Sequence, residues 1–520
     1  MQQTITIKLK PAEADNATVI NRHIGSTIAV AKNRISGFHV IKRSLDARSR
    51  QPWIILTVLV FVDEPFYSPV IQQLTLLDVS ASKEHVVIVG AGPAGLFAAL
   101  KLIENGIKPI ILERGQDVRT RRRDLARINK EGIINPESNY CFGEGGAGTY
   151  SDGKLYTRSS KRGDVARILN VLVQFGAEER IRADAHPHIG TNKLPQIITA
   201  IRERIIACGG QVLFGQKVND LIVQDGKIKA VRTAAGLELA TDQLILATGH
   251  SARDIFELLD SKNILIESKP FALGVRVEHP QELIDQIQYH CPVRDPYLPP
   301  ASYNLVHQIG GKGVFSFCMC PGGIIAPAAT AANEIVVNGW SPSKRNNPFA
   351  NSGIVVSIEE KDYQDHHQSP ALAALAFQHE VEKRAFDHGG GKLVAPAQRL
   401  VDFSQRKLSA DLPDCSYLPG INSAPLDQVL PPFVYSALAN AFIEFGKKMK
   451  GYFTNDALVV ATESRTSSPI RIPRDNETLE HPQVKGLYPC SEGAGYAGGI
   501  VSAAMDGENV VSAILKRKNY

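Results

Sequence analysis

The sequence predicts an α/β protein: a three-layer main domain with a parallel sheet, an inserted mixed-sheet domain and a small α/β module in front. Three observations support this. A strand, a glycine-rich turn, a helix and a second strand follow one another within residues 86–115. Short strands separated by Asp-Gly and Ala-Gly turns occupy residues 211–247. A strand of small residues and another glycine-rich turn occupy residues 486–500, so two distant segments are expected to complete one domain.

Composition places the chain among ordinary globular proteins. Its 520 residues are enough for about three to four domains. A net charge of +5 is small for this length and implies no particular partner, so a nucleic-acid partner is not expected from it. The seven cysteines form neither a disulfide framework nor paired zinc ligands. The most apolar run, 53–62, is about half of the roughly 20 residues that cross a membrane. We expect a cytoplasmic protein without a metal site or a membrane partner.

Residues 1–80 are expected to form the small α/β module. Residues 4–9, 38–44 and 53–62 have the pattern of strands, and residues 17–32 fit a helix. No catalytic constellation occurs here. The basic residues between 42 and 50 fit a solvated loop better than a partner surface.

The turn at residues 90–95 has the spacing Gly-x-Gly-x-x-Gly. Gly90 permits the tight turn, Gly92 lets the backbone approach a pyrophosphate, and Gly95 lets helix and strand pack closely. The helix that follows directs its free N–H groups at the phosphates. Glu113, after the second strand, is placed to accept a hydrogen bond from a ribose hydroxyl. The segment therefore predicts a dinucleotide site.

Two later segments resemble those that follow the first βαβ unit in glutathione-reductase-like flavoproteins, and this resemblance implies that they complete the site. A β-meander is predicted from four strands, and the last of them runs into Thr248 and Gly249. Near residue 490 a strand ends in Glu492, and a helix opens at about Ile500; its positive end would stabilise negative charge on a bound ring. The meander strands are expected at 211–214, 218–224, 227–233 and 243–247.

Several further segments resemble one bacterial family. They are the glycine-rich loop 142–155 and residues 249–254, 269–280, 317–323 and 463–469. Together with the turn at 90–95 they resemble the FAD-dependent dehydrogenases of unassigned substrate, within the glutathione-reductase-like FAD/NAD(P)-binding superfamily. The resemblance covers nearly the whole chain from about residue 80. It implies FAD and an oxidoreductase, and it implies no substrate.

The residues expected to contact the cofactor combine these motifs. They are Gly90, Gly92, Pro93, Ala94, Gly95, Glu113, Arg114, Gly145, Gly146, Thr149, Val218, Thr248, Gly249, Glu492, Gly493, Gly499 and Ile500. The basic run 119–123 fits a solvated helix face better than a partner of the diphosphate.

The catalytic candidates are weaker. Asp152 and Lys154 are the preferred polar pair near the flavin ring, on loop position alone, and His250 follows the Ala-Thr-Gly strand. In a regular strand the side chains of Cys318 and Cys320 would be parallel, with the residues about 6.5–7 Å apart, which disfavours a disulfide. Packing is therefore the leading interpretation of these two cysteines, ahead of lining a cavity and of a catalytic dithiol.

The predicted organisation is a module at 1–80, the first part of an FAD-binding domain at 81–250, an inserted substrate domain at 251–460 and the rest of the FAD-binding domain at 461–520. Residues 251–460 hold no second glycine fingerprint, so NAD(P)H is expected only as a transient reductant. The leading function is a flavin oxidoreductase that transfers a hydride through flavin N5 and acts on a small molecule. The alternatives are a flavoprotein that acts with RNA or another macromolecule through the first module, and a flavin sensor without turnover.

Overall fold

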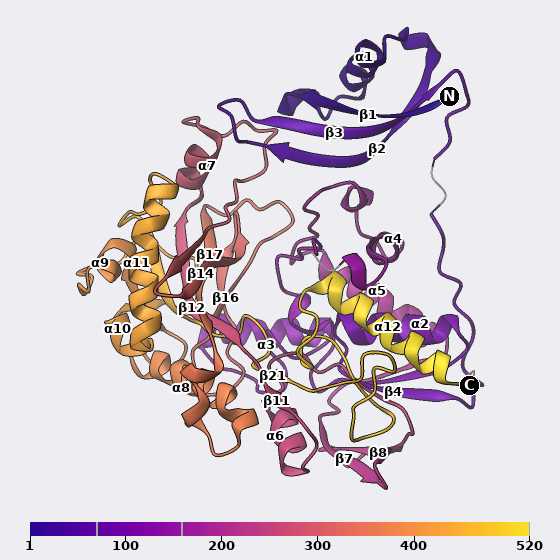
Figure 1. Cartoon of the computed structure of the whole chain (residues 1–520), viewed down its shortest axis with the longest axis vertical. Coiled ribbons are helices and arrows are strands. Elements are labelled where there is room, and N and C mark those ends of the chain that lie inside the picture. Colours follow the sequence, from indigo (N-terminus) through magenta and orange to yellow (C-terminus); the bar gives the residue numbers. More distant parts are fainter. Residues whose placement is uncertain (69–70, 158–159, 519–520) are drawn as a thin grey trace.

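The computed structural model describes residues 1–68, 71–157 and 160–518. Figure 1 shows a small sheet at the top, a parallel sheet with helices below it, and a larger sheet beside the parallel one. The mixed α/β class that the sequence predicts is therefore correct. In the described residues no helix is both long and apolar enough to span a bilayer.

The N-terminal unit is a three-stranded antiparallel sheet covered by one helix. β3 lies between β1 and β2. The side chains of β3 alternate between a buried and a partly exposed face, as in a sheet covered on one side. Ile20 and Ile24 of α1 pack onto the buried face. The elements are β1 (Gln2–Leu9), α1 (Ala17–Ile28), β2 (Ile35–Asp46) and β3 (Trp53–Val62).

The parallel sheet has the strand order β22-β10-β4-β5-β6. β4 lies in the middle and pairs in parallel with β10 and β5. The turns after these strands gather at one edge, because parallel strands share a direction. The strands are β4 (His85–Val89), β5 (Lys108–Leu112), β6 (Gln211–Leu213), β10 (Leu244–Leu246) and β22 (Leu487–Pro489).

Both faces of this sheet are covered, which gives three layers. In β4, Val86 and Ile88 pack with the helices on one side, whereas Val87 and Val89 pack toward a second, smaller sheet. The helices of the first side include α12, which packs along α2. The helices of this half are α2 (Pro93–Glu104), α3 (Val118–Glu131), α4 (Val165–Gln174), α5 (Leu194–Ala207), α6 (Arg253–Ser261) and α12 (Ile500–Lys518).

The smaller sheet is a meander, but its membership differs from the prediction. It consists of β7 (Val218–Gln224), β8 (Lys227–Thr233) and β9 (Glu238–Ala240). The predicted strands at 211–214 and 243–247 exist, in shortened form, but they belong to the parallel sheet. Such short strands carry too few side chains for their pattern to show which sheet they join.

The third part is a seven-stranded sheet in the order β13-β14-β17-β12-β20-β18-β19. All described neighbours are antiparallel except β18 and β19. The strands are β12 (Phe271–Pro280), β13 (Val306–Ile309), β14 (Lys312–Cys320), β17 (Phe349–Ile358), β18 (Ala395–Arg399), β19 (Ile421–Ser423) and β20 (Leu458–Glu463).

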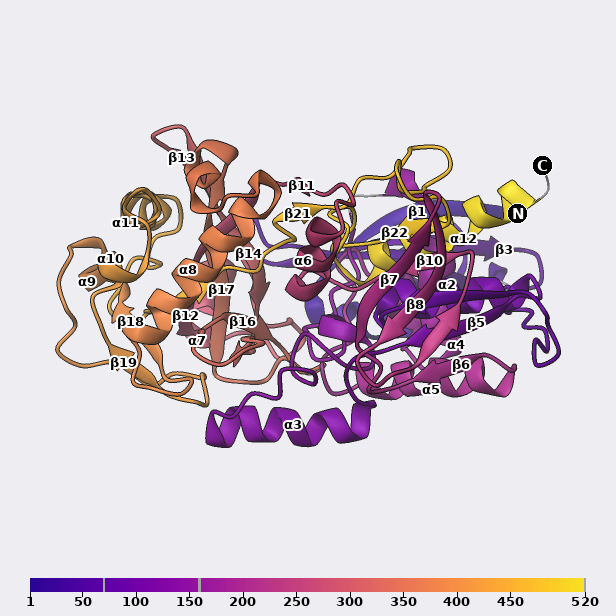
Figure 2. The same cartoon turned by 90° about the horizontal axis from the view of Figure 1, so that it is seen from below.

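Helices α8 (Ala373–Asp387) and α11 (Pro432–Lys448) pack on this sheet and share its core. Figure 2 shows α11 on the outer side, away from the parallel sheet. The remaining strands and α-helices are β11 (Glu267–Ser268), α7 (Gln281–Tyr289), β15 (Ile324–Pro327), β16 (Val337–Trp340), α9 (Leu400–Ser404), α10 (Leu426–Val429) and β21 (Ile470–Arg471).

Candidate functional site

A cavity lies where the carboxyl edge of the parallel sheet meets the seven-stranded sheet. Its walls come from the turn after β4, the end of β5, the loop 140–154, the turn after β10, the start of α12 and the ends of β14 to β16. Ligands of open α/β sheets bind at this edge of the strands. The cavity is therefore the candidate site.

The three glycines of the fingerprint occupy different environments. Gly90 has a φ of +108°, and a Cβ on Gly95 would lie 2.0 Å from the carbonyl oxygen of Gly90, so neither position admits a side chain. Gly92 has an extended backbone that any residue can adopt, and a Cβ there would meet nothing within 4 Å. Gly92 lines the cavity together with Pro93 and Ala94, whereas Gly95 packs beneath it.

Glu113 is buried at the end of β5 and also lines the cavity. Its carboxylate accepts hydrogen bonds from the backbone N–H groups of Ala91 at 2.8 Å, Gly115 at 2.9 Å and Gly143 at 3.0 Å. A carboxylate has about four lone-pair positions, so about one remains for a ligand. The sequence predicted that Glu113 contacts only a ligand. It did not predict that Glu113 also joins three segments of the site.

Arg114, the next residue, also lines the cavity. It forms ion pairs with Glu137 at 2.7 Å and Asp254 at 2.8 Å, and its guanidinium lies 4.0 Å from the centre of the Phe142 ring. The side chain thus links the loop before the glycine-rich segment to α6.

The glycine-rich loop packs directly on the fingerprint. The N–H of Gly145 donates to the carbonyl of Ala91 at 2.8 Å, and a Cβ on Gly146 would lie 3.3 Å from the Cα of Gly92. Thr149 donates its hydroxyl to the carbonyl of Glu144 at 2.8 Å and is buried away from the cavity. Of the three predicted contacts in this loop, only Gly146 lines the cavity.

Arg121 holds this loop from below. Its guanidinium is fully buried and donates to the carbonyl oxygens of Asn139 at 2.8 Å, Tyr140 at 2.9 Å and Glu144 at 2.8 Å. The solvated face expected for residues 119–123 is therefore wrong at this position. The run of basic residues carried no signal that one member points inward.

The turn after β10 supplies an unpartnered hydroxyl. The Oγ1 atom of Thr248 is buried without a hydrogen-bond partner in the described chain, and Thr248 lines the cavity with Gly249 and Val218. Gly493 lies behind this wall, because a Cβ there would be 2.6 Å from the carbonyl oxygen of Gly249. A buried polar atom without a partner is costly, which points to a ligand at Thr248.

His250 also lines the cavity. Its Nδ1 lies 2.8 Å from the hydroxyl of Ser251. Burial, with the nearby cation of Arg465, lowers the pKa of His250 to about 4, so that the ring is neutral at neutral pH.

The C-terminal segment forms the opposite wall. Glu492, Gly499 and Ile500 line the cavity, and α12 begins at Ile500 with no acidic residue in its first turn. Burial raises the pKa of Glu492 to about 7, although Lys269 opposes the shift. The helix end is thus a positive pole beside a readily protonated carboxyl group.

Asp152 and Lys154 meet in the cavity wall. The Nζ of Lys154 lies 2.9 Å from the carboxylate of Asp152, and Arg345 reaches the same carboxylate at 2.7 Å. Burial alone would raise the pKa of Asp152, but the two cations hold it well below its ordinary value. Arg345 was missed, because nothing in its loop sequence links it to residue 152.

The geometry predicted for the two cysteines is wrong. Two residues of β14 oppose one residue of β17 between Phe317 and Cys320, which is a β-bulge, and Cys318 has a φ of +46°. Both sulfur atoms turn toward Lys154, whose Nζ is 3.8 Å from the Sγ of Cys318 and 3.7 Å from that of Cys320. Cys318 lines the cavity, and Cys320 is buried behind it.

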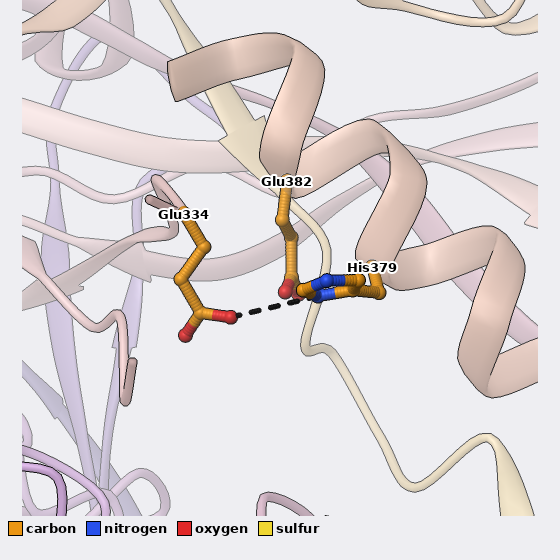
Figure 3. A group of neighbouring side chains, drawn as sticks. All are labelled: Glu334, His379 and Glu382. Atoms are coloured by element: carbon orange, nitrogen blue, oxygen red, sulfur yellow. Dashed lines mark ion pairs between the residues drawn. The ribbon is translucent and has the colours of Figure 1, made fainter. Parts of the chain in front are cut away.

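A cluster of charges lies behind the site. Figure 3 shows Glu334, His379 and Glu382, three groups whose ligand atoms lie within 4.8 Å of one another. The carboxylates already accept from Arg465, at 2.7 Å for Glu334 and 3.0 Å for Glu382, and Arg253 reaches Glu382 at 2.7 Å. Because two guanidinium groups already balance the two carboxylates, the arrangement fits an ion-pair network and not a divalent cation.

Three family models match the chain. The model of the FAD-dependent protein, C-terminal domain-like, matches residues 270–466. The model of the pyridine nucleotide-disulphide oxidoreductases matches residues 84–263. A domain of unknown function matches residues 1–61.

Two relatives show how far the similarity extends. A protein of Clostridium beijerinckii, described as uncharacterized, is 39% identical over 97% of both chains. A thiamine thiazole synthase of Methanococcus vannielii is 27% identical over 34% of this chain and 60% of its own. Among solved structures, the halogenase PltM in complex with phloroglucinol and FAD is 12% identical with a TM-score of 0.36, over 84% of this chain and 71% of its own. At that score the last likeness carries no argument.

Proposed function

We propose that this chain is an oxidoreductase that uses bound FAD to pass a hydride to or from a small-molecule substrate. The chain belongs to the same family of FAD-dependent proteins as its Clostridium beijerinckii relative. FAD is the cofactor of this family, and the flavin supplies the hydride chemistry at its N5 atom. The observation that carries the proposal is the continuity of the cavity, which joins the glycine fingerprint to the start of α12 and to Lys154.

The proposed pyrophosphate site is the turn around Gly92. No side chain caps α2, so the N–H groups of its first turn are free to donate to an anion. The open space in front of Gly92 allows a phosphate to approach the backbone, and the orphaned hydroxyl of Thr248 adds a donor in the same cavity. These features fit the phosphate half of FAD. Glu113 is the proposed ribose acceptor.

The proposed flavin site is the other end of the cavity. The N-terminus of α12 at Ile500 would face developing negative charge on the ring, and Glu492 would hold a proton near it. Asp152 positions Lys154, whose ammonium is a fixed positive charge in the wall. His250 is neutral and can accept or donate a hydrogen bond there.

The remaining expectations belong to the same proposal. NAD(P)H would enter the cavity as a transient reductant and leave before the second substrate binds, which gives ping-pong kinetics. The division at residues 80, 250 and 460, and a cytoplasmic location, stay proposals.

Anaerobic titration of the purified protein tests the proposed function. We expect a yellow protein that releases FAD, whose flavin absorbance near 450 nm is bleached by NADH or NADPH. Steady-state kinetics with a quinone acceptor should then give parallel double-reciprocal lines. Release of FMN, or a colourless protein that does not take up FAD, would overturn the cofactor assignment; intersecting lines would overturn the shared cavity.

A further inference from the structure

We propose that Cys318 and Cys320 are a redox-active dithiol that cycles with a disulfide between the two residues, and that the oxidised co-substrate is a low-molecular-weight disulfide. The inference rests on the proposed function, because that function brings the reducing equivalents to the cavity.

The bulge in β14 makes the pairing possible. Residues two apart in a regular strand hold their side chains parallel and are too far apart for a disulfide. The left-handed backbone of Cys318 breaks that geometry, and the sulfur of Cys320 lies 3.2 Å from the carbonyl oxygen of Cys318. The two thiols therefore share one small space instead of one face of a strand.

Two cations flank this space. Lys154 contacts both sulfur atoms, and the Nη2 atom of Arg276 lies 3.4 Å from the Sγ of Cys320 and 2.7 Å from the carbonyl oxygen of Cys318. Each cation has its own carboxylate, Asp152 for Lys154 and Glu463 for Arg276. Positive charge beside a thiol favours the thiolate, which is the reactive form.

The two thiols are not equivalent. A hydrogen bond from Cys320, together with the positive charges of Lys154 and Arg276, lowers the pKa of the Cys318 thiol despite its burial. The same hydrogen bond and burial raise the pKa of Cys320. Cys318 also lines the cavity, whereas Cys320 lies behind it. This asymmetry assigns Cys318 as the nucleophile and Cys320 as the resolving thiol.

The chemistry balances as a thiol–disulfide exchange. The Cys318 thiolate attacks one sulfur of the disulfide RSSR, which breaks its S–S bond and releases RS⁻. Cys320 then attacks the Cys318 sulfur of the mixed disulfide, gives its proton to the first RS⁻ and displaces the second RS⁻. The products are RSH, RS⁻ and the Cys318–Cys320 disulfide. Its return to a thiolate and a thiol takes two electrons and one proton, the content of one hydride.

Alkylation of the purified FAD-bound protein is the first test. We expect iodoacetamide to modify Cys318 at a rate that levels off well below pH 8.5, the ordinary thiol pKa. In Lys154→Met the rate at pH 6 should fall roughly tenfold for each unit by which the pKa rises. A Cys318 rate with the pH profile of an ordinary thiol, unchanged in Lys154→Met, would overturn the proposal.

Trapping with 2-hydroxyethyl disulfide is the second test. We expect mass spectrometry to find a Cys318–Cys320 link and a loss of two hydrogen atoms in the unmodified protein. Cys320→Ser should stop at a mixed disulfide on Cys318, and Cys291→Ser, outside the cavity, should behave like the parent. Absence of the link and of the mixed disulfide would overturn the proposal.

The two proposals fail in different ways. A flavin that nicotinamides bleach, in a protein whose thiols never link, would leave the oxidoreductase proposal standing and remove the dithiol. Thiols that link in a protein whose flavin no nicotinamide bleaches would leave the dithiol standing and remove the nicotinamide donor.

Discussion

The two ends of the cavity differ in the kind of polar group that lines them. At the fingerprint end most of the polar groups are backbone N–H groups, and the buried acid Glu113 is largely occupied by three of them. At the other end the polar groups are side chains. Lys154, Asp152 and Arg345 form one ion-paired group, and Arg276 with Glu463 forms another around the two thiols.

This difference separates binding from chemistry. Backbone donors have fixed positions and no titration near neutral pH, so the fingerprint end can orient a ligand but cannot exchange protons with it. The side-chain end contains ion-paired groups, and the transfer of one proton or electron pair changes the charge balance among them. We therefore expect substitutions at the first end to act through shape, and those at the second through charge.

The largest contrast is expected within the fingerprint itself. Gly92→Val should fold normally, because its backbone is extended and its Cβ would enter open space, yet it should lose FAD by filling the phosphate site. Gly95→Val should misfold, because its Cβ would overlap the carbonyl of Gly90. Circular dichroism and FAD content of the purified variants separate the two outcomes. A Gly92→Val protein that retains FAD would contradict the placement of the pyrophosphate.

Removal of one charge at the other end should cost stability. Arg276→Met leaves Glu463 buried without its partner and should lower the free energy of unfolding by about 3–5 kcal/mol. The double variant Arg276→Met/Glu463→Gln is the matched control, and most of the loss should be recovered in it. Urea denaturation measures both, and equal losses would show that packing, not charge, holds this end.

The smallest effect is expected at Glu113. Glu113→Ala removes an acceptor of three backbone N–H groups and should weaken FAD binding by roughly 1.5–3 kcal/mol. Glu113→Gln keeps one carbonyl oxygen and should lose less. Flavin fluorescence titration gives both affinities. Unchanged binding in the alanine variant would contradict the role of Glu113 as the ribose acceptor.

The ends also differ in how well the sequence predicts them. The turn at 90–95 and Glu113 belong to one βαβ unit, so their spacing alone predicts a common site. Lys154, Arg345 and Cys318 come from three separate segments, and no spacing connects them. The bulge at Cys318 was unpredictable for another reason: the alternating pattern of β14 reads as a regular strand, and only the pairing with β17 reveals the extra residue.

The packing of α12 against α2 has a consequence for synthesis. Gly507 admits no side chain, because a Cβ there would lie 2.2 Å from the carbonyl oxygen of Ala94, so the last helix closes directly on the first turn of the fingerprint helix. When residues 85–115 of a nascent chain have left the ribosome, α12 has not yet been made. At 5–20 residues per second the ribosome needs roughly 20 to 80 s to reach Gly507. Throughout that interval the apolar face of α2 is not covered by α12. A chaperone that binds apolar surfaces can bind this face during that time.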